Sequence, residues 1–245
     1  MKNFELHTFA SADELASRVA GLWLDEIESA RRSGQAYCVA LSGGHIARTF
    51  FAATAEQARE RKTFFGRVHF FWADERCVPP TDLESNFKLA SELLLAPLKI
   101  PENQIHRLRG EIPPAEAVKI AEAEYCRVLP DKIMDLILLG MGEDGHVASL
   151  FPNASSGILN CAVPFLAVEN SPKPPPRRIS LSYAVIAAAK QVWALVSGAG
   201  KQPALRESLK PDGDTPLARV LQSRSQTKIF SDILVGGFET KRSSV

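Results

Sequence analysis

The sequence predicts an α/β fold, in the form of a three-layer α/β/α sandwich with a mostly parallel, Rossmann-like sheet. Short apolar runs of strand length alternate with longer segments in which apolar residues recur at helical spacing. Glycine-rich turns follow several of the apolar runs, as at the strand-to-helix junctions of a parallel sheet. The 245 residues, of which 45% are hydrophobic, can bury a substantial core, so we expect a single domain over residues 1–245.

The helices are predicted from capping signals and apolar periodicity. Ser11 and Glu14 have the spacing of a capping box, and an apolar face that includes Leu15 and Trp23 follows them. A helix should therefore begin at Ser11 and end near Arg32. By similar reasoning we expect further helices over residues 45–61, 87–98, 115–128 and 201–209.

The strands are predicted from the short apolar runs. We expect them over residues 37–41, 68–72, 133–139, 162–168, 179–181 and 192–196, with a last strand over residues 228–230. The polar residues 73–82 should form a loop, and residues 171–176, which include four prolines, a rigid surface loop. Parallel order places the turns after the strands at one edge of the sheet, which is where ligands bind in open α/β sheets.

Composition and charge exclude several classes of function. The formal net charge of +1 gives no electrostatic reason to expect binding to nucleic acid or to an acidic membrane surface. The four cysteines form no C-x-x-C pair, so neither a zinc site nor a redox motif is indicated, and we expect no metal. The chain begins without the apolar region of a signal peptide and contains no apolar run long enough to span a bilayer. We therefore expect a cytoplasmic protein, either a monomer or a small homo-oligomer.

The turn after residues 133–139 is the best candidate for an active-site loop. Gly140, Gly142 and Gly145 permit a tight turn, and Asp144 and His146 lie close to them. A histidine beside carboxylates in such a turn is a candidate general base, but a structural histidine bonded to a neighbouring carboxylate gives the same pattern. Residues 140–145 also fit the dinucleotide fingerprint G-x-G-x-x-G, although the two carboxylates within the turn would repel a pyrophosphate.

Three other turns carry groups that suit an anion. Residues 42–44 (Ser-Gly-Gly) offer backbone amides at a predicted helix N-terminus. Residues 74–76 (Asp-Glu-Arg) supply a guanidinium, and Lys201 follows the glycine-containing residues 197–200. Each group also has a plain structural explanation, as a tight turn, a solvated loop or a surface lysine. Together at one sheet edge, the four turns describe a pocket for a small phosphorylated sugar or polyol.

The sequence resembles the 6-phosphogluconolactonase family, whose relatives include the glucosamine-6-phosphate isomerases/deaminases. The resemblance covers nearly the whole chain and is carried by ALSGG at residues 40–44, FWADERCVPPTDLESNF at 71–87, IHRLRGE at 105–111, DLILLGMGEDGHVASLFPN at 135–153, RRISLS at 177–182 and SGAGK at 197–201. The blocks at 71–87 and 135–153 are long and specific, and they favour the lactonase branch. The resemblance implies a three-layer α/β sandwich, no required cofactor, and hydrolysis of 6-phospho-D-glucono-1,5-lactone to 6-phosphogluconate in the oxidative pentose phosphate pathway.

Roles for individual residues follow as hypotheses. His146 would be the general base that takes a proton from the attacking water, and Asp74 or Asp144 would orient its imidazole. Backbone amides of the glycine turns are candidate donors to the oxyanion. The groups that would bind the phosphorylated lactone are Ser42, Gly43, Gly44, Arg76, Arg178 and Lys201.

Two positions depart from the family's pattern. The family commonly has a hydroxyl residue and then Thr-Pro after the paired glycines, where this chain has His45, Ile46 and Ala47; it usually has Thr after the catalytic histidine, where this chain has Val147. These changes should affect substrate affinity more than chemistry. Three alternatives stay open: a glucosamine-6-phosphate isomerase/deaminase, a non-catalytic sugar-phosphate sensor, and a dinucleotide-dependent oxidoreductase.

Overall fold

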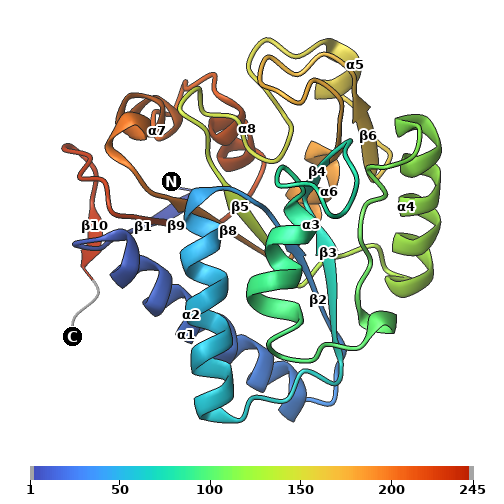
Figure 1. Ribbon diagram of the computed structural model, residues 1–245. Coiled ribbons are helices and arrows are strands. Elements are labelled where there is room, and N and C mark those ends of the chain that lie inside the picture. Colours follow the sequence, from blue (N-terminus) through green and yellow to red (C-terminus); the bar gives the residue numbers. More distant parts are fainter. Residues whose placement is uncertain (1–2, 243–245) are drawn as a thin grey trace.

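The computed structural model describes residues 3–242, and its central sheet contains seven strands, each parallel to its neighbours (Figure 1). The strands lie in the order β10-β1-β9-β8-β5-β2-β3. Their bounds are β1 (Phe4–Thr8), β2 (Tyr37–Leu41), β3 (Val68–Trp72), β5 (Leu136–Gly140), β8 (Gln191–Val196), β9 (Thr227–Ser231) and β10 (Thr240–Arg242). A second, antiparallel sheet has the order β4-β7-β6 and is formed by β4 (Asp74–Arg76), β6 (Phe165–Val168) and β7 (Arg178–Leu181).

Helices flank the central sheet, so the predicted α/β class is confirmed (Figure 1). The three longest are α1 (Ala12–Arg32), α2 (His45–Arg61) and α4 (Pro114–Val128), and α1 packs against α2. The shorter ones are α3 (Asn86–Ala90), which continues into a π-helical turn over Ser91–Leu95, α5 (Ser156–Leu159), α6 (Tyr183–Ala188), α7 (Gln202–Ser208) and α8 (Pro216–Gln222). Among residues 3–242, no helix has the length and apolar character needed to cross a membrane.

The start of α1 shows how the local sequence determines an element. Ser11 Oγ accepts a hydrogen bond from the Glu14 amide at 3.2 Å, and the Glu14 carboxylate accepts one from the Ala10 amide at 2.7 Å. These two bonds satisfy amides that a helix N-terminus otherwise leaves unpaired. Leu15 and Trp23 on the apolar face are fully buried, so the predicted capping signal and the predicted apolar stripe are both confirmed.

Ala73 joins the two sheets. Its amide donates to the Leu41 carbonyl at the end of β2, and its carbonyl accepts from the Leu181 amide of β7, both at 2.7 Å. The polar loop predicted over residues 73–82 is therefore wrong in its first part, because residues 74–76 form β4. Asp74 and Glu75 are buried in this strand, but three polar residues give no apolar signal from which a strand could be predicted.

The order of the strands brings the four polar turns together. β8, β5, β2 and β3 are consecutive neighbours in the sheet and run parallel, so their carboxyl ends meet at one edge. The segments that leave these ends are the turns singled out in the sequence. The small sheet adds β7 beside β4 at the same edge, which places the proline-rich residues 171–176 near the site (Figure 1).

Candidate active site

A polar pocket with a volume of about 90 Å³ lies at this edge of the sheet. It is lined by Ser42, Gly43, Gly44, His45, Ile46, Asp74, Arg76, Asn86, Gly140, Met141, His146, Ala148, Arg178 and Lys201. The structure therefore brings together every predicted site residue except Asp144, and Asp144 contacts one of the lining residues directly. The roles of these residues remain predictions.

His146 and Asp144 form a directly bonded pair in the turn after β5. Nδ1 of His146 lies 2.5 Å from Oδ1 of Asp144. An ionised carboxylate only accepts hydrogen bonds, so the proton is inferred to be on Nδ1, which leaves the lone pair on Nε2. Within the described part of the chain, no hydrogen bond engages Nε2. This is the protonation state that a general base requires.

The surroundings of the pair keep the imidazole neutral. Burial lowers the pKa of His146, and the hydrogen bond to Asp144 offsets this only in part. Burial alone would raise the pKa of Asp144, but the hydrogen bonds that it accepts from His146 outweigh this effect, so the pKa of Asp144 lies below its ordinary value. The imidazole packs against the Phe151 ring with centroids 4.7 Å apart. A Cβ at Gly142 would lie 2.1 Å from the imidazole, so only glycine leaves room for this ring position.

Asp74 is held by other partners and does not bond to His146. Its Oδ2 accepts from the Ser149 hydroxyl at 2.7 Å, and its Oδ1 accepts from the Asn86 side-chain amide at 3.3 Å. Asn86 also packs closely against Gly43, where a Cβ would lie 1.9 Å from its Oδ1. Of the two carboxylates considered from the sequence, Asp144 contacts the imidazole, while Asp74 connects β4 to Ser149 in the segment after β5 and to Asn86 at the start of α3.

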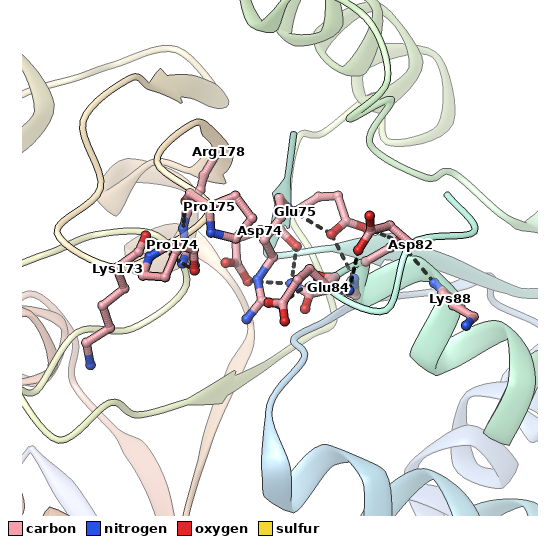
Figure 2. Close-up of polar contacts among 12 residues, drawn as sticks. Asp74, Glu75, Asp82, Glu84, Lys88, Lys173, Pro174, Pro175 and Arg178 are labelled. Carbon is pink, nitrogen blue, oxygen red and sulfur yellow. Dashed lines mark hydrogen bonds and ion pairs between the residues drawn. The ribbon is translucent and has the colours of Figure 1, made fainter. Parts of the chain in front are cut away.

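Two arginines face the pocket from neighbouring strands of the small sheet. Arg76 of β4 and Arg178 of β7 are direct partners in the antiparallel register. Figure 2 shows Arg178 close to Asp74 of β4. Like charges directly opposite each other destabilise a sheet unless an anion compensates them. Nη1 of Arg76 donates to the Glu84 carbonyl at 2.6 Å, whereas its buried Nε has no partner among the described residues. The pairing favours an anionic ligand.

Other groups that suit an anion complete the pocket. Lys201 has no hydrogen bond or ion pair within residues 3–242, and burial lowers its pKa. Ser42 Oγ is buried and likewise lacks a partner in this range. Gly44, at φ +103°, caps the 17-residue helix α2 and leaves first-turn amides without intrahelical acceptors. Each group has hydrogen-bonding capacity available for a ligand.

Several residues at the site were not singled out from the sequence. Lys173, in the proline-rich segment, places its ammonium 3.3 Å from Oδ1 of Asp144. Glu75 accepts from the amides of Arg76, Asn86 and Phe87, and burial raises its pKa to about 7 although these amides lower it. Figure 2 shows Glu75 among the polar contacts that order residues 82–88. No local sequence signal indicates either contact.

Comparisons with known proteins show the family of the chain. Residues 10–229 match the family described as glucosamine-6-phosphate isomerases/6-phosphogluconolactonase. The chain belongs to this family. It is 34% identical to a 6-phosphogluconolactonase of Haemophilus influenzae over 79% of this chain and 84% of that protein, and 39% identical to one of Mycobacterium tuberculosis over 72% and 73%. A solved 6-phosphogluconolactonase from Thermotoga maritima, 29% identical, superposes with a TM-score of 0.79 over 93% of this chain and 98% of that one.

The two departures from the glucosamine-6-phosphate isomerase/6-phosphogluconolactonase family pattern lie in different surroundings. His45 is the exposed first residue of α2 and lines the pocket, so it offers an imidazole where the family has a hydroxyl. Val147 is completely buried and packs in the core. A valine there supplies no side-chain hydrogen bond, but the adjacent pair of Asp144 and His146 is formed without one.

Among residues 3–242, no group of three or more His, Cys, Asp or Glu side chains is arranged to hold a metal ion.

Proposed function

We propose that this protein hydrolyses 6-phospho-D-glucono-1,5-lactone to 6-phosphogluconate, the lactonase step of the oxidative pentose phosphate pathway. The observation that carries the proposal is the bonded pair of Asp144 and His146, with its free Nε2, in a pocket that is also lined by Arg76, Arg178 and Lys201. The substrate combines an ester, which needs a base to activate water, with a phosphate, which needs cations. The family relatives that are named 6-phosphogluconolactonases support the same assignment.

The reaction would proceed by direct attack of water on the lactone carbonyl. Nε2 of His146 takes a proton from the water as its oxygen bonds to C1, and Asp144 stabilises the resulting imidazolium. Backbone amides of the glycine turns are our candidates for stabilising the oxyanion. When the intermediate collapses, the bond between C1 and the ring oxygen breaks, and the imidazolium returns its proton to that oxygen. The products are a free hydroxyl and a carboxylic acid, which ionises by releasing its proton to solvent, and His146 is regenerated.

The phosphate would bind at the cationic side of the pocket. Arg76 and Arg178 would share it across the small sheet, which would relieve their mutual repulsion. Lys201 and the first-turn amides after Gly44 would add further donors. A fixed phosphate holds the distant carbonyl in place against His146, so that binding energy far from the reacting bond contributes to rate.

The proposal includes two finer expectations. The ligand is a small phosphorylated sugar lactone, bound without a cofactor, and the protein is a monomer or a small homo-oligomer in the cytoplasm. The sensor alternative draws on the changed turn at residues 45–47, and it predicts ligand binding without turnover. The isomerase/deaminase alternative draws on the breadth of the family, and it predicts release of ammonia from glucosamine-6-phosphate.

A rapid kinetic assay on freshly generated lactone tests the proposal, with the spontaneous hydrolysis rate subtracted. We expect acceleration by the wild type and a loss of about 10²- to 10⁴-fold in kcat/KM in His146→Ala. His7→Gln, on β1 and outside the pocket, is the matched control and should retain activity. A folded wild type that does not exceed the spontaneous rate would exclude the lactonase, and an ammonia assay would then separate the remaining alternatives.

A further inference from the structure

The segment Ser171–Pro176, here called the proline loop, is fixed by its own chemistry. Four of its six residues are prolines, which have no amide to donate. The Ser171 amide donates to the Pro176 carbonyl at 2.8 Å, and the Lys173 amide donates to Ser171 Oγ at 3.2 Å. These two bonds close the loop around Lys173.

Arg178 anchors the proline loop, and Figure 2 shows it beside Pro174 and Pro175. Its Nε donates to the Pro175 carbonyl at 3.1 Å, and its Nη2 donates to the carbonyls of Lys173 and Pro174 at 3.2 and 3.0 Å. The guanidinium is buried and lies over the Phe151 ring at 5.5 Å from the centroid. The carbonyls of Lys173, Pro174 and Pro175 all accept hydrogen bonds from this one rigid, buried guanidinium. The backbone of Lys173 therefore has a defined position next to the pocket.

The side chain of Lys173 reaches the pair described above. Its Nζ lies 3.3 Å from Oδ1 of Asp144, the same atom that accepts from Nδ1 of His146. One carboxylate oxygen is therefore held between an imidazole and an ammonium. Exposed ion pairs usually contribute little, because ordering two long side chains costs entropy. Here the backbone of the lysine is already fixed, so less of that cost remains.

We propose that Lys173 is a positioning residue for the Asp144–His146 pair: it holds Asp144 Oδ1 in place, and through that atom it orients His146 for the proposed lactonase reaction. The inference rests on the proposed function only for its effect on catalysis. The coupling between Lys173 and His146 is a property of the protein without substrate. Besides its proposed contact with the phosphate, Arg178 would contribute to this positioning, since it supports the loop that carries Lys173.

Titration of His146 by NMR tests the coupling directly. The charged and titratable groups that face His146 are Asp144 in its own turn, Asp74 of β4 and Lys173. The same pocket is lined by His45, Arg76, Arg178 and Lys201. Lys173→Met removes a cation whose charge disfavours the imidazolium. The apparent pKa of His146 should therefore rise, by roughly 0.2 to 0.7 unit for an ion pair of this exposure.

The controls are chosen to separate this effect from folding. Lys173→Arg keeps the charge and should restore the wild-type titration. Lys190→Met removes a comparable ion pair, in which Nζ lies 2.8 Å from Asp135 Oδ1 at the opposite end of β5, and it should leave the titration of His146 unchanged. The imidazole signals of His146 are identified by their loss in His146→Gln. Titration curves of wild type and Lys173→Met that coincide would overturn the proposal.

Kinetics on the lactone provide the second readout. In Lys173→Met we expect the acid limb of kcat/KM to move to higher pH by the same amount, with kcat reduced more than KM is raised. A rise in KM alone, with an unmoved acid limb, would mean that Lys173 binds substrate and would overturn the positioning role. If the wild type does not hydrolyse the lactone but the titration still moves, the coupling stands and the proposed reaction fails.

Discussion

Two histidines of this protein donate to a carboxylate through Nδ1, but they differ in whether the other ring nitrogen, Nε2, has a hydrogen-bond partner. His146 Nδ1 contacts Asp144 at 2.5 Å, and His106 Nδ1 contacts Glu124 at 2.7 Å. The Nε2 of His106 is engaged by Nδ1 of His69 at 2.9 Å, whereas the Nε2 of His146 has no partner among residues 3–242. Since the lone pair of His106 is already used, only His146 can accept a proton from water.

The neighbours of the two carboxylates reinforce the difference. Glu124 is bonded to Arg127 at 2.6 Å, and this bond, with that of His106, lowers the pKa of Glu124 to about 2 against the effect of its partial burial. The side chain of His106 is 2% exposed, and that of His146 is 17% exposed. His106 and Glu124 line a larger cavity, of about 480 Å³. Cavity size alone would therefore favour His106, whereas the free Nε2 favours His146 as the proposed base.

The largest expected effect is a loss of activity when Asp144 is changed, but not when Glu124 is changed. Asp144→Asn should lower kcat/KM on the lactone by roughly 10²- to 10⁴-fold, because an amide can present its NH₂ to Nδ1 and favour the wrong tautomer of His146. Glu124→Gln is the matched variant and should leave kcat/KM near the wild-type value. Steady-state kinetics on purified proteins measure both. Equal losses in the two variants would contradict the comparison.

The next effect concerns Arg76, one of the cations that line the pocket of the first pair. Arg76→Met should lower kcat/KM by about 10- to 100-fold, mainly through KM, because a charge-assisted contact to the phosphate is lost. It should also remove the increase in Tm that inorganic phosphate gives the wild type. Kinetics and thermal unfolding with and without phosphate measure these changes. An unchanged KM would exclude Arg76 from phosphate binding.

The third expected effect is a loss of protein stability, without a loss of activity, when His106 is changed. His106→Gln should lower the free energy of unfolding by about 1–3 kcal/mol, because a glutamine cannot reproduce the geometry of both buried hydrogen bonds. Chemical denaturation measures this loss, and kcat/KM should remain within the error of the wild type. A large loss of activity in a folded His106→Gln protein would mean that the second pair also serves the reaction.

The smallest expected effect is a pH dependence of the stability that His106 and its partner His69 contribute. Burial lowers the pKa of His106 and of His69 below the unfolded value of about 6.5. A depressed folded-state pKa means that the stability contributed by the neutral pair is present above about pH 6.5 and is lost as the pH falls. The difference in unfolding free energy between wild type and His106→Gln should therefore shrink below that pH, by less than about 1 kcal/mol. Denaturation series across the range measure it, and a difference that grows on acidification would reverse the sign.

The sequence predicts those parts of the fold whose signals are local. The cap at Ser11 and the strand at residues 37–41 follow from patterns within a few residues, and both are confirmed. β1 and β10 are not among the predicted strands. β1 reads Phe-Glu-Leu-His-Thr, and its alternation of apolar and polar residues, which is typical of a strand, extends over only five residues. β10 reads Thr-Lys-Arg and has no apolar residue. β7 is predicted as a strand, but its antiparallel pairing with β4 depends on a partner about 100 residues away and is visible only in the structure.

The candidate site likewise has parts that local sequence signals predict and parts that depend on contacts between distant segments. The candidates His146, Asp74 and Arg76 follow from residue types in turns after strands, and the pocket contains all three. The sequence offers two carboxylates for His146 with no means of choosing between them, since the choice depends on the turn that folds Asp144 back onto the imidazole. Lys173 is 29 residues from Asp144, and only the proline loop and its anchor bring them together.

Ala73 has a consequence for which substrates the protein can accept. The base belongs to the central sheet and the two arginines to the small sheet, and the two sheets are joined through the backbone of this one buried residue. With no flexible linker at the junction, the separation between the phosphate-binding groups and the imidazole is set by the fold. Such a pocket should select substrates by the number of carbon atoms between the phosphate and the carbonyl. A phosphorylated lactone that is shorter by one carbon should bind through its phosphate, but its carbonyl should not be aligned with His146.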